Sequence, residues 1–184
     1  MDCHVEFPPL HDGARNDGYE MRTTRIIGID PGLVTTGWGI IESNGSNLRF
    51  IACGTIAPPT KAPLSERLAF LHHELTKLIK THQPQTAAIE ETFVTANGAS
   101  TLKLGQARGA LIVTLAASGL PVAEYAARLV KKAIVGTGTA DKNQMGQMVT
   151  VLLPAAREML TACKHDAADA LAIAITHALH SKFR

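Results

Sequence analysis

Cysteine, aromatic residues and long hydrophobic runs are scarce in this sequence of 184 residues. Its three cysteines, Cys3, Cys53 and Cys163, are odd in number and far apart, so they indicate neither a disulfide framework nor a zinc site. No apolar run approaches the roughly 20 residues that span a bilayer, and the first residues lack the layout of a signal peptide. These absences argue against disulfide-rich secreted proteins and membrane proteins, and we expect a cytoplasmic location with no membrane partner.

A strong excess of one charge is also missing, since the net charge is only +2. The charges are nevertheless unevenly spread. Residues 1–24 hold five acids and two bases, which leaves 16 bases and 11 acids in the other 160 residues. This modest basic bias permits a polyanionic partner without requiring one.

The first 22 residues differ from the rest of the chain. They show no hydrophobic period and contain two prolines and two Asp-Gly pairs, at 12–13 and 17–18. We therefore predict a disordered N-terminal extension over 1–22 and one domain over 23–184, with an ordered tail as the alternative. Met21, directly before RTTRIIGID, is a candidate natural start.

Short apolar and β-branched segments predict five strands. They are IIGID (26–30), TGWGIIES (36–43), LRFIACGTI (48–56), TAAIE (86–90) and PVAEYA (121–126). The Asn-Gly of NGSN (44–47) is typical of a tight hairpin, so the first three strands should be consecutive and antiparallel.

Helical patterns fill most of the remaining chain. Leucines spaced four and three apart from Leu64 to Leu78 predict a helix that ends at Gln83-Pro84. Segment 99–118 predicts a mostly apolar helix, in which Gly105 and Gly109 would let a neighbouring element approach. Further helices are expected over 127–135, 141–153, 155–162 and 166–180. The order predicts an α/β fold: a five-stranded mixed sheet with helices on both faces, in which right-handed crossovers place strands four and five beside strand one.

Two of the predicted strands end on an acid, Asp30 and Glu90. If these strands are parallel neighbours, both acids reach the carboxyl edge of the sheet, where α/β proteins place their sites. We choose Glu90 over Glu91 because Glu90 is in phase with the inward-facing Ala88. Taken alone, Asp30 also suits a turn, since Asp-Pro-Gly is favourable turn chemistry.

Asp166 and Asp169 lie three apart, on one face of the last helix, which is otherwise apolar. Acids at this position can cap the helix. Buried carboxylates without basic partners are costly, however, and a divalent cation would remove that cost. Four carboxylates suit Mg²⁺, with Mn²⁺ as a substitute. Two such ions, about 3.5–4 Å apart, can clamp the attacking and leaving oxygens of a phosphodiester. His165 either tunes or ligates a metal or is a surface residue.

Four long segments resemble the RuvC family of bacterial Holliday-junction resolvases over residues 25–180. They are RIIGIDPGLVTTGWGII, AAIEETFVTANGASTLKLGQARGA, VAEYAARLVKKAIVGTGTADKNQM and DAADALAIAITHAL. The resemblance implies an RNase H-like nuclease domain over 23–184. It implies a homodimer, formed partly through 99–118, that binds a four-way DNA junction and nicks two opposed strands with Mg²⁺ in recombination and repair. It also implies the branch-migration proteins RuvA and RuvB as partners.

By position, the four acids of that family fall on Asp30, Glu90, Asp166 and Asp169, which the resemblance makes both catalytic residues and metal ligands. The aromatic residue of the family falls on Phe93, which would stack on an unpaired base or belong to the core. Its basic residues would contact phosphates or be solvated helix residues. They fall on Lys131 and Lys142. We expect the surface that contacts phosphates to extend further, to Arg128, Lys132, Lys103 and Arg108.

Three other interpretations remain open at this point. Actin-like and sugar-kinase ATPases share the opening Gly-Ile-Asp-x-Gly, but they need a second such domain and a second glycine-rich loop, which this chain lacks. A related RNase H-like nuclease could cut structured RNA. A junction-binding module without cleavage is the third alternative, and the intact set of four acids argues against it.

Overall fold

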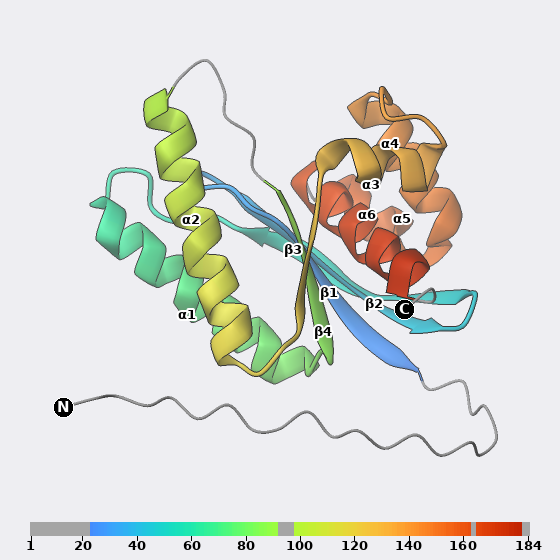
Figure 1. Cartoon of the computed structure of the whole chain (residues 1–184), viewed down its shortest axis with the longest axis horizontal. Coiled ribbons are helices and arrows are strands. Elements are labelled where there is room, and N and C mark those ends of the chain that lie inside the picture. Colours follow the sequence, from blue (N-terminus) through green and yellow to red (C-terminus); the bar gives the residue numbers. More distant parts are fainter. Residues whose placement is uncertain (1–22, 92–97, 163–164, 182–184) are drawn as a thin grey trace.

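The computed structural model describes residues 23–91, 98–162 and 165–181 (Figure 1). The strands are β1 (Thr24–Asp30), β2 (Thr36–Asn44), β3 (Asn47–Ile56), β4 (Thr86–Glu90) and β5 (Val122–Tyr125). The helices are α1 (Leu64–His82), α2 (Gly98–Ala117), α3 (Ala127–Val135), α4 (Lys142–Leu152), the 3-10 turn η1 (Pro154–Ala156), α5 (Arg157–Ala162) and α6 (His165–His180). Within this part of the chain no helix is long and apolar enough to cross a membrane. The predicted extension 1–22 lies outside the described residues.

The strands form one sheet in the order β3-β2-β1-β4-β5. β2 pairs antiparallel with β1 and β3, whereas β4 pairs parallel with β1 and β5. This confirms the predicted mixed sheet with its first three strands antiparallel. One part of the predicted order is wrong: β5 lies outside β4 and not beside β1, because β2 and β4 already occupy both edges of β1.

The predicted hairpin between the second and third strands is confirmed. Asn44 pairs with Asn47, so only two residues form the turn. Gly45 has a φ of 57°, a left-handed conformation that glycine adopts without steric cost. The tight turn brings β3 directly onto β2 and leaves β1 free to pair with β4 on its other edge.

Helices cover both faces of the sheet: α1 and α2 lie on one face and α3 to α6 on the other (Figure 1). Side chains alternate along a strand, so β1 contributes to both cores. Ile27 and Ile29 pack with α1 and α2, whereas Ile26 packs in the core that contains Leu171 of α6. Asp30 is in phase with Ile26 and therefore belongs to the face that α6 covers.

Helix α6 lies directly on the backbone of β1 and β2. A Cβ atom at Gly28 would lie 2.2 Å from the carbonyl oxygen of Ala170, and one at Gly37 would lie 1.9 Å from that of Asp166. Ten residues of α6 are buried, which explains why its sequence is apolar almost all round. These two glycines therefore set the distance between the sheet and the helix that carries Asp166 and Asp169.

The other predicted close approach, at Gly105 and Gly109 in α2, is not found in the described part of the chain. A Cβ at either position would meet no atom within 4 Å outside the helix's own turns. Both glycines face open space because β5 and α1 contact α2 on its other side, through buried residues such as Ala107 and Leu111.

Candidate active site

Three elements bring the four predicted acids to one edge of the sheet. β1 and β4 run parallel, with Ile29 opposite Ile89, so the next residues, Asp30 and Glu90, leave the sheet at the same edge. Glu90 is in phase with Ala88, which packs in the core beneath α6. The first turns of α6 then carry Asp166 and Asp169 over this edge.

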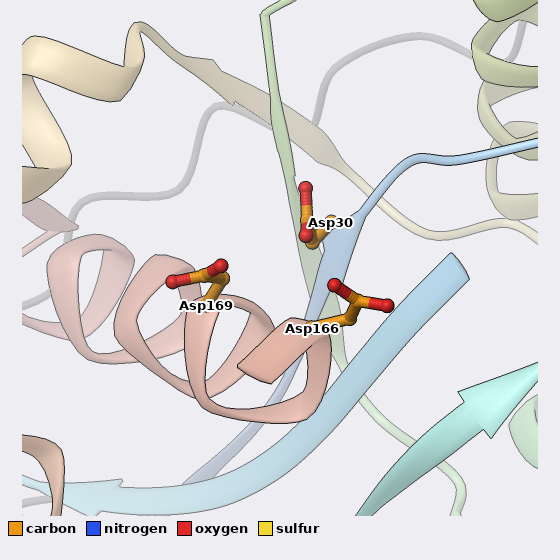
Figure 2. Close-up of side chains that lie close together, drawn as sticks. All are labelled: Asp30, Asp166 and Asp169. Carbon is orange, nitrogen blue, oxygen red and sulfur yellow. The ribbon is translucent and has the colours of Figure 1, made fainter. Parts of the chain in front are cut away.

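Asp30, Asp166 and Asp169 form a tight group (Figure 2). One carboxylate oxygen from each lies within 4.8 Å of the other two. Glu90 is outside this group, but it lines a cavity of about 270 Å³ together with Asp30 and Asp169. All four acids are half-buried. The structure thus brings together the acids that the sequence placed on three separate elements.

Three of these acids, Asp30, Glu90 and Asp169, have raised pKa values, chiefly because they are buried and also because they lie close to other acids. Burial, and then the charges of Glu90, Asp169 and Asp166, raise the pKa of Asp30 from 3.8 to about 8. Burial, and then Asp169, raise the pKa of Glu90 from 4.5 to about 7. The pKa of Asp169 is raised as well, mainly by burial. These three carboxylates resist ionisation because water is excluded and their neighbours carry the same charge.

Two lysines offset part of this repulsion. Lys131 and Lys142 line the same cavity, and both lower the pKa values of Glu90 and Asp169. Their effect is smaller than that of burial. Half-buried carboxylate oxygens in mutual repulsion are the donor set that hard divalent cations take, so the residues present fit a Mg²⁺ or Mn²⁺ site.

Lys142 is held by the start of α4. The side chain of Asp141 accepts a hydrogen bond from the Gln144 backbone N–H at 2.9 Å, and Gln144 Oε1 accepts one from the Asp141 backbone N–H at 3.0 Å. This reciprocal capping begins the helix at Lys142. The lysine backbone is therefore fixed where its side chain can reach the acids.

The other predicted DNA contacts lie farther from the acids. Arg128 and Lys132 are exposed on α3 and do not line the acid cavity. The Arg128 side chain covers Gly138, where a Cβ would lie 2.6 Å from its Cγ. Lys103 is exposed on α2. Phe93 lies outside the described residues. His165 begins α6, is exposed, and lies outside the tight acid group.

Arg108 is engaged inside the chain. Its Nε donates a hydrogen bond to the Glu90 carbonyl oxygen at 2.9 Å, and its guanidinium forms an ion pair with Glu124 of β5. It thereby ties α2 to the end of β4, which carries Glu90. This role was not predicted from the sequence, because no local pattern relates an arginine on one helix to the end of a strand.

The close contact of Gly28 and Gly37 with α6 was likewise not predicted from the sequence. A signal was present: both belong to buried strands, where glycine weakens pairing and often marks a close approach of another backbone. Which element approaches them depends on the tertiary structure.

A family model described as crossover junction endodeoxyribonuclease RuvC matches residues 26–177. The RuvC protein of Xanthobacter autotrophicus is 56% identical over 161 residues, covering 88% of this chain and 93% of that protein. A solved structure of T. thermophilus RuvC in complex with a Holliday junction substrate has a TM-score of 0.75 and 29% identity, and the match covers 86% of this chain and 95% of that one.

The yeast mitochondrial Holliday junction resolvase Ydc2 has a TM-score of 0.63 at 17% identity, covering 85% of this chain and 79% of that one, and shows the shared fold. Both structural neighbours confirm the predicted RNase H-like α/β fold. With a family model over most of its length and relatives above 50% identity, this chain belongs to the RuvC family of crossover junction endodeoxyribonucleases.

Proposed function

We propose that this chain is an endonuclease that resolves four-way DNA junctions by nicking two opposed strands, in homologous recombination and DNA repair. The observation that carries the proposal is the meeting of Asp30, Asp166 and Asp169 within 4.8 Å, with Glu90, Lys131 and Lys142 around the adjoining cavity. Membership of the RuvC family and the junction bound to the T. thermophilus relative support it.

The four acids would hold Mg²⁺, with Mn²⁺ as a substitute and two ions per site. When bound, such ions supply an activated water and neutralise charge on the leaving oxygen. The protein contributes the position of the ligands. Asp30 and Glu90 are fixed by the paired strands β1 and β4, and Asp166 and Asp169 by the seating of α6 on Gly28 and Gly37. Rigid supports of this kind preserve a catalytic geometry better than loops.

Lys131 and Lys142 would contact phosphate oxygens on either side of the bond that is cut. They lie on different helices, α3 and α4, and both line the acid cavity. Such contacts position the DNA and do not read its sequence. Arg128, Lys132 and Lys103 remain proposed extensions of this surface, and Phe93 is proposed to stack on an unpaired base. We no longer include Arg108, because it is bonded to Glu90 and Glu124.

A pair of active sites could nick the two opposed strands of one bound junction, and we propose a homodimer. The outer face of α2 offers a surface for it: Leu102 and Val113 are 65% and 66% exposed, and Gly105 and Gly109 between them leave room for a second helix. We also propose RuvA and RuvB as partners and a cytoplasmic location. The nuclease domain would span 23–184, after an N-terminal extension over 1–22.

The test uses the purified protein and an immobile four-way junction, with Mg²⁺ or with EDTA. We expect paired nicks at opposed positions in Mg²⁺ and binding without nicks in EDTA. Structured RNA and an ATP-hydrolysis assay serve as controls for the rival activities. Efficient cutting of the RNA, or binding of the junction without nicks in either Mg²⁺ or Mn²⁺, would refute the proposal.

A further inference from the structure

A larger cavity lies next to the acid cavity, and we call it the side groove. It has a volume of about 730 Å³ and lies between α4, α5 and the first turn of α6. Its lining residues are Lys142, Asn143, Gly146, Gln147, Thr150, Arg157, Leu160, Thr161, His165, Asp166 and Ala168. Lys142 lines both cavities, and Asp166 belongs to the tight acid group. The side groove therefore continues directly from the place where we expect a strand to be cut.

The shape of the groove follows from the spacing of residues on α4. Lys142, Gly146 and Thr150 are four apart, so they lie on one face of that helix. A Cβ at Gly146 would meet no atom within 4 Å. The middle of this wall is thus open, and small or apolar residues, Leu160 and Ala168, face it from α5 and α6.

The charges on the lining favour a bound anion. Lys142 and Arg157 are both exposed, and neither takes part in any of the ion pairs found among the described residues. Asp166 is the one acid in the lining, and it belongs to the tight acid group that we propose to hold metal. Two exposed cations and an open stretch of wall at Gly146 in one groove match a sugar–phosphate chain, whose charged phosphates alternate with uncharged sugars.

We propose that the side groove binds the backbone of the strand being cut, at nucleotides next to the scissile phosphate, with Arg157 contacting one of the flanking phosphates. This inference rests on the proposed function. The inference assigns a substrate-binding role to Arg157. The open space at Gly146 would accommodate a sugar of the bound strand.

The first test compares Arg157→Ala with Lys80→Ala. Lys80 is also exposed, but it lies on α1, on the opposite face of the sheet. Junction binding is measured by fluorescence anisotropy in EDTA at several salt concentrations. We expect Arg157→Ala to bind the junction more weakly. Its plot of log affinity against log salt concentration should be shallower, with the magnitude of the negative slope reduced by about 1. Lys80→Ala should behave as wild type. Identical slopes for the two variants would overturn the inference.

The second test locates the contact. Neutral methylphosphonates replace, one at a time, the phosphates within three nucleotides of the cut. At the contacted phosphate, the replacement should weaken binding of wild type but cost Arg157→Ala nothing further, which is the signature of a pairwise interaction. Equal losses for both proteins at every position would contradict the assignment.

The third test fills the groove. Gly146→Gln places a side chain in the open space, whereas Gly146→Ala adds only a methyl group. We expect junction binding and nicking to fall with the size of the added side chain, least for Gly146→Ala and most for Gly146→Gln, with the melting temperatures of both variants at or above that of wild type. Unchanged nicking by Gly146→Gln would refute the groove. Failure of wild type to nick the junction would refute the proposed function instead, so the two failures are distinguishable.

Discussion

At the scale of single residues, the acid group is held together against electrostatic repulsion. The pKa of Asp30 lies at about 8 and that of Glu90 at about 7 in the folded protein, against 3.8 and 4.5 ordinarily. A folded state that binds a proton more tightly than the unfolded chain is stabilised at low pH. That stability is fully present below the unfolded pKa and is lost as pH rises through the folded pKa.

We therefore expect the metal-free protein to lose stability as the pH rises from about 4, near the ordinary pKa of these acids, to about 8, the pKa of Asp30 in the folded protein. The measurement is calorimetric melting in EDTA across this range, for wild type and for the double variant Asp30→Asn/Glu90→Gln. Because both proteins contain the other titrating groups, such as His82, whose pKa is lowered by burial, the comparison cancels the contribution of those groups to the pH dependence. A pH dependence as steep in the double variant as in wild type would show that these acids are not the cause.

Asp30→Asn should abolish nicking and preserve junction binding. It removes one carboxylate from the tight group but leaves Lys131 and Lys142 in place. In EDTA its melting temperature should rise by roughly 2–8 °C, because relief of about 1–2 kcal/mol shifts the midpoint of a domain of this size by that amount. Nicking at the wild-type rate, measured in single turnover, would show that the site has been misplaced.

The acids themselves were predictable from sequence, and the reason is local. The alternation of side chains along a strand indicates the face on which an acid at its end lies. The spacing of three likewise indicates that two acids share one face of a helix. The tie between Arg108 and Glu90 was not predictable, since it joins α2 to the end of β4 and leaves no trace in the spacing of either element.

At the scale of elements, the site depends on how closely α6 approaches the sheet. Gly28→Ala should destabilise the protein by about 1–3 kcal/mol, because the added Cβ would lie 2.2 Å from a backbone oxygen of α6, which cannot move alone. The nicking rate should fall even at a temperature where the variant stays fully folded, since the displaced helix carries Asp166 and Asp169. Denaturant unfolding and single-turnover nicking at 20 °C measure the two effects.

Gly146→Ala is the matched control for this change. It adds the same methyl group to a helix where nothing lies within 4 Å, so stability should rise by up to about 1 kcal/mol. Comparable destabilisation by the two alanine substitutions would contradict the close-approach argument.

Arg108→Ala should impair nicking while leaving junction binding intact. The variant loses the hydrogen bond to the Glu90 carbonyl and the ion pair with Glu124, so the end of β4 is held less firmly. We expect a higher Mg²⁺ concentration for half-maximal nicking. Glu124→Ala loses only the ion pair and should change that concentration less. An unchanged Mg²⁺ dependence in Arg108→Ala would exclude this positioning role.

The elements were largely predictable because each follows a simple period with clear turn signals. The order of the strands in the sheet was less predictable. The sequence indicates that β5 follows a helical crossover, but the strand edge that β5 joins depends on which edges are already paired. The α6 contact on Gly28 and Gly37 is likewise a property of the assembled layers, which no single segment encodes.

At the scale of the whole molecule, the proposed dimer makes two sites act on one junction. Val113→Asp on α2 should shift the protein toward the monomer in sedimentation velocity, because it places a charge on the face that we propose to be buried. Val151→Asp on α4 is the matched control, since both valines are 66% exposed. A dimer that survives Val113→Asp as well as it survives Val151→Asp would place the interface elsewhere.

The burial of α6 against β1 has a consequence for the lifetime of the site. Both elements are among the most buried of the described chain, and segments of this kind exchange their amide hydrogens only when the whole domain opens. Local fluctuations that loosen the periphery would therefore leave the spacing of the acids unchanged. On heating, metal-binding capacity and the slowest-exchanging amides should disappear together, in a single transition.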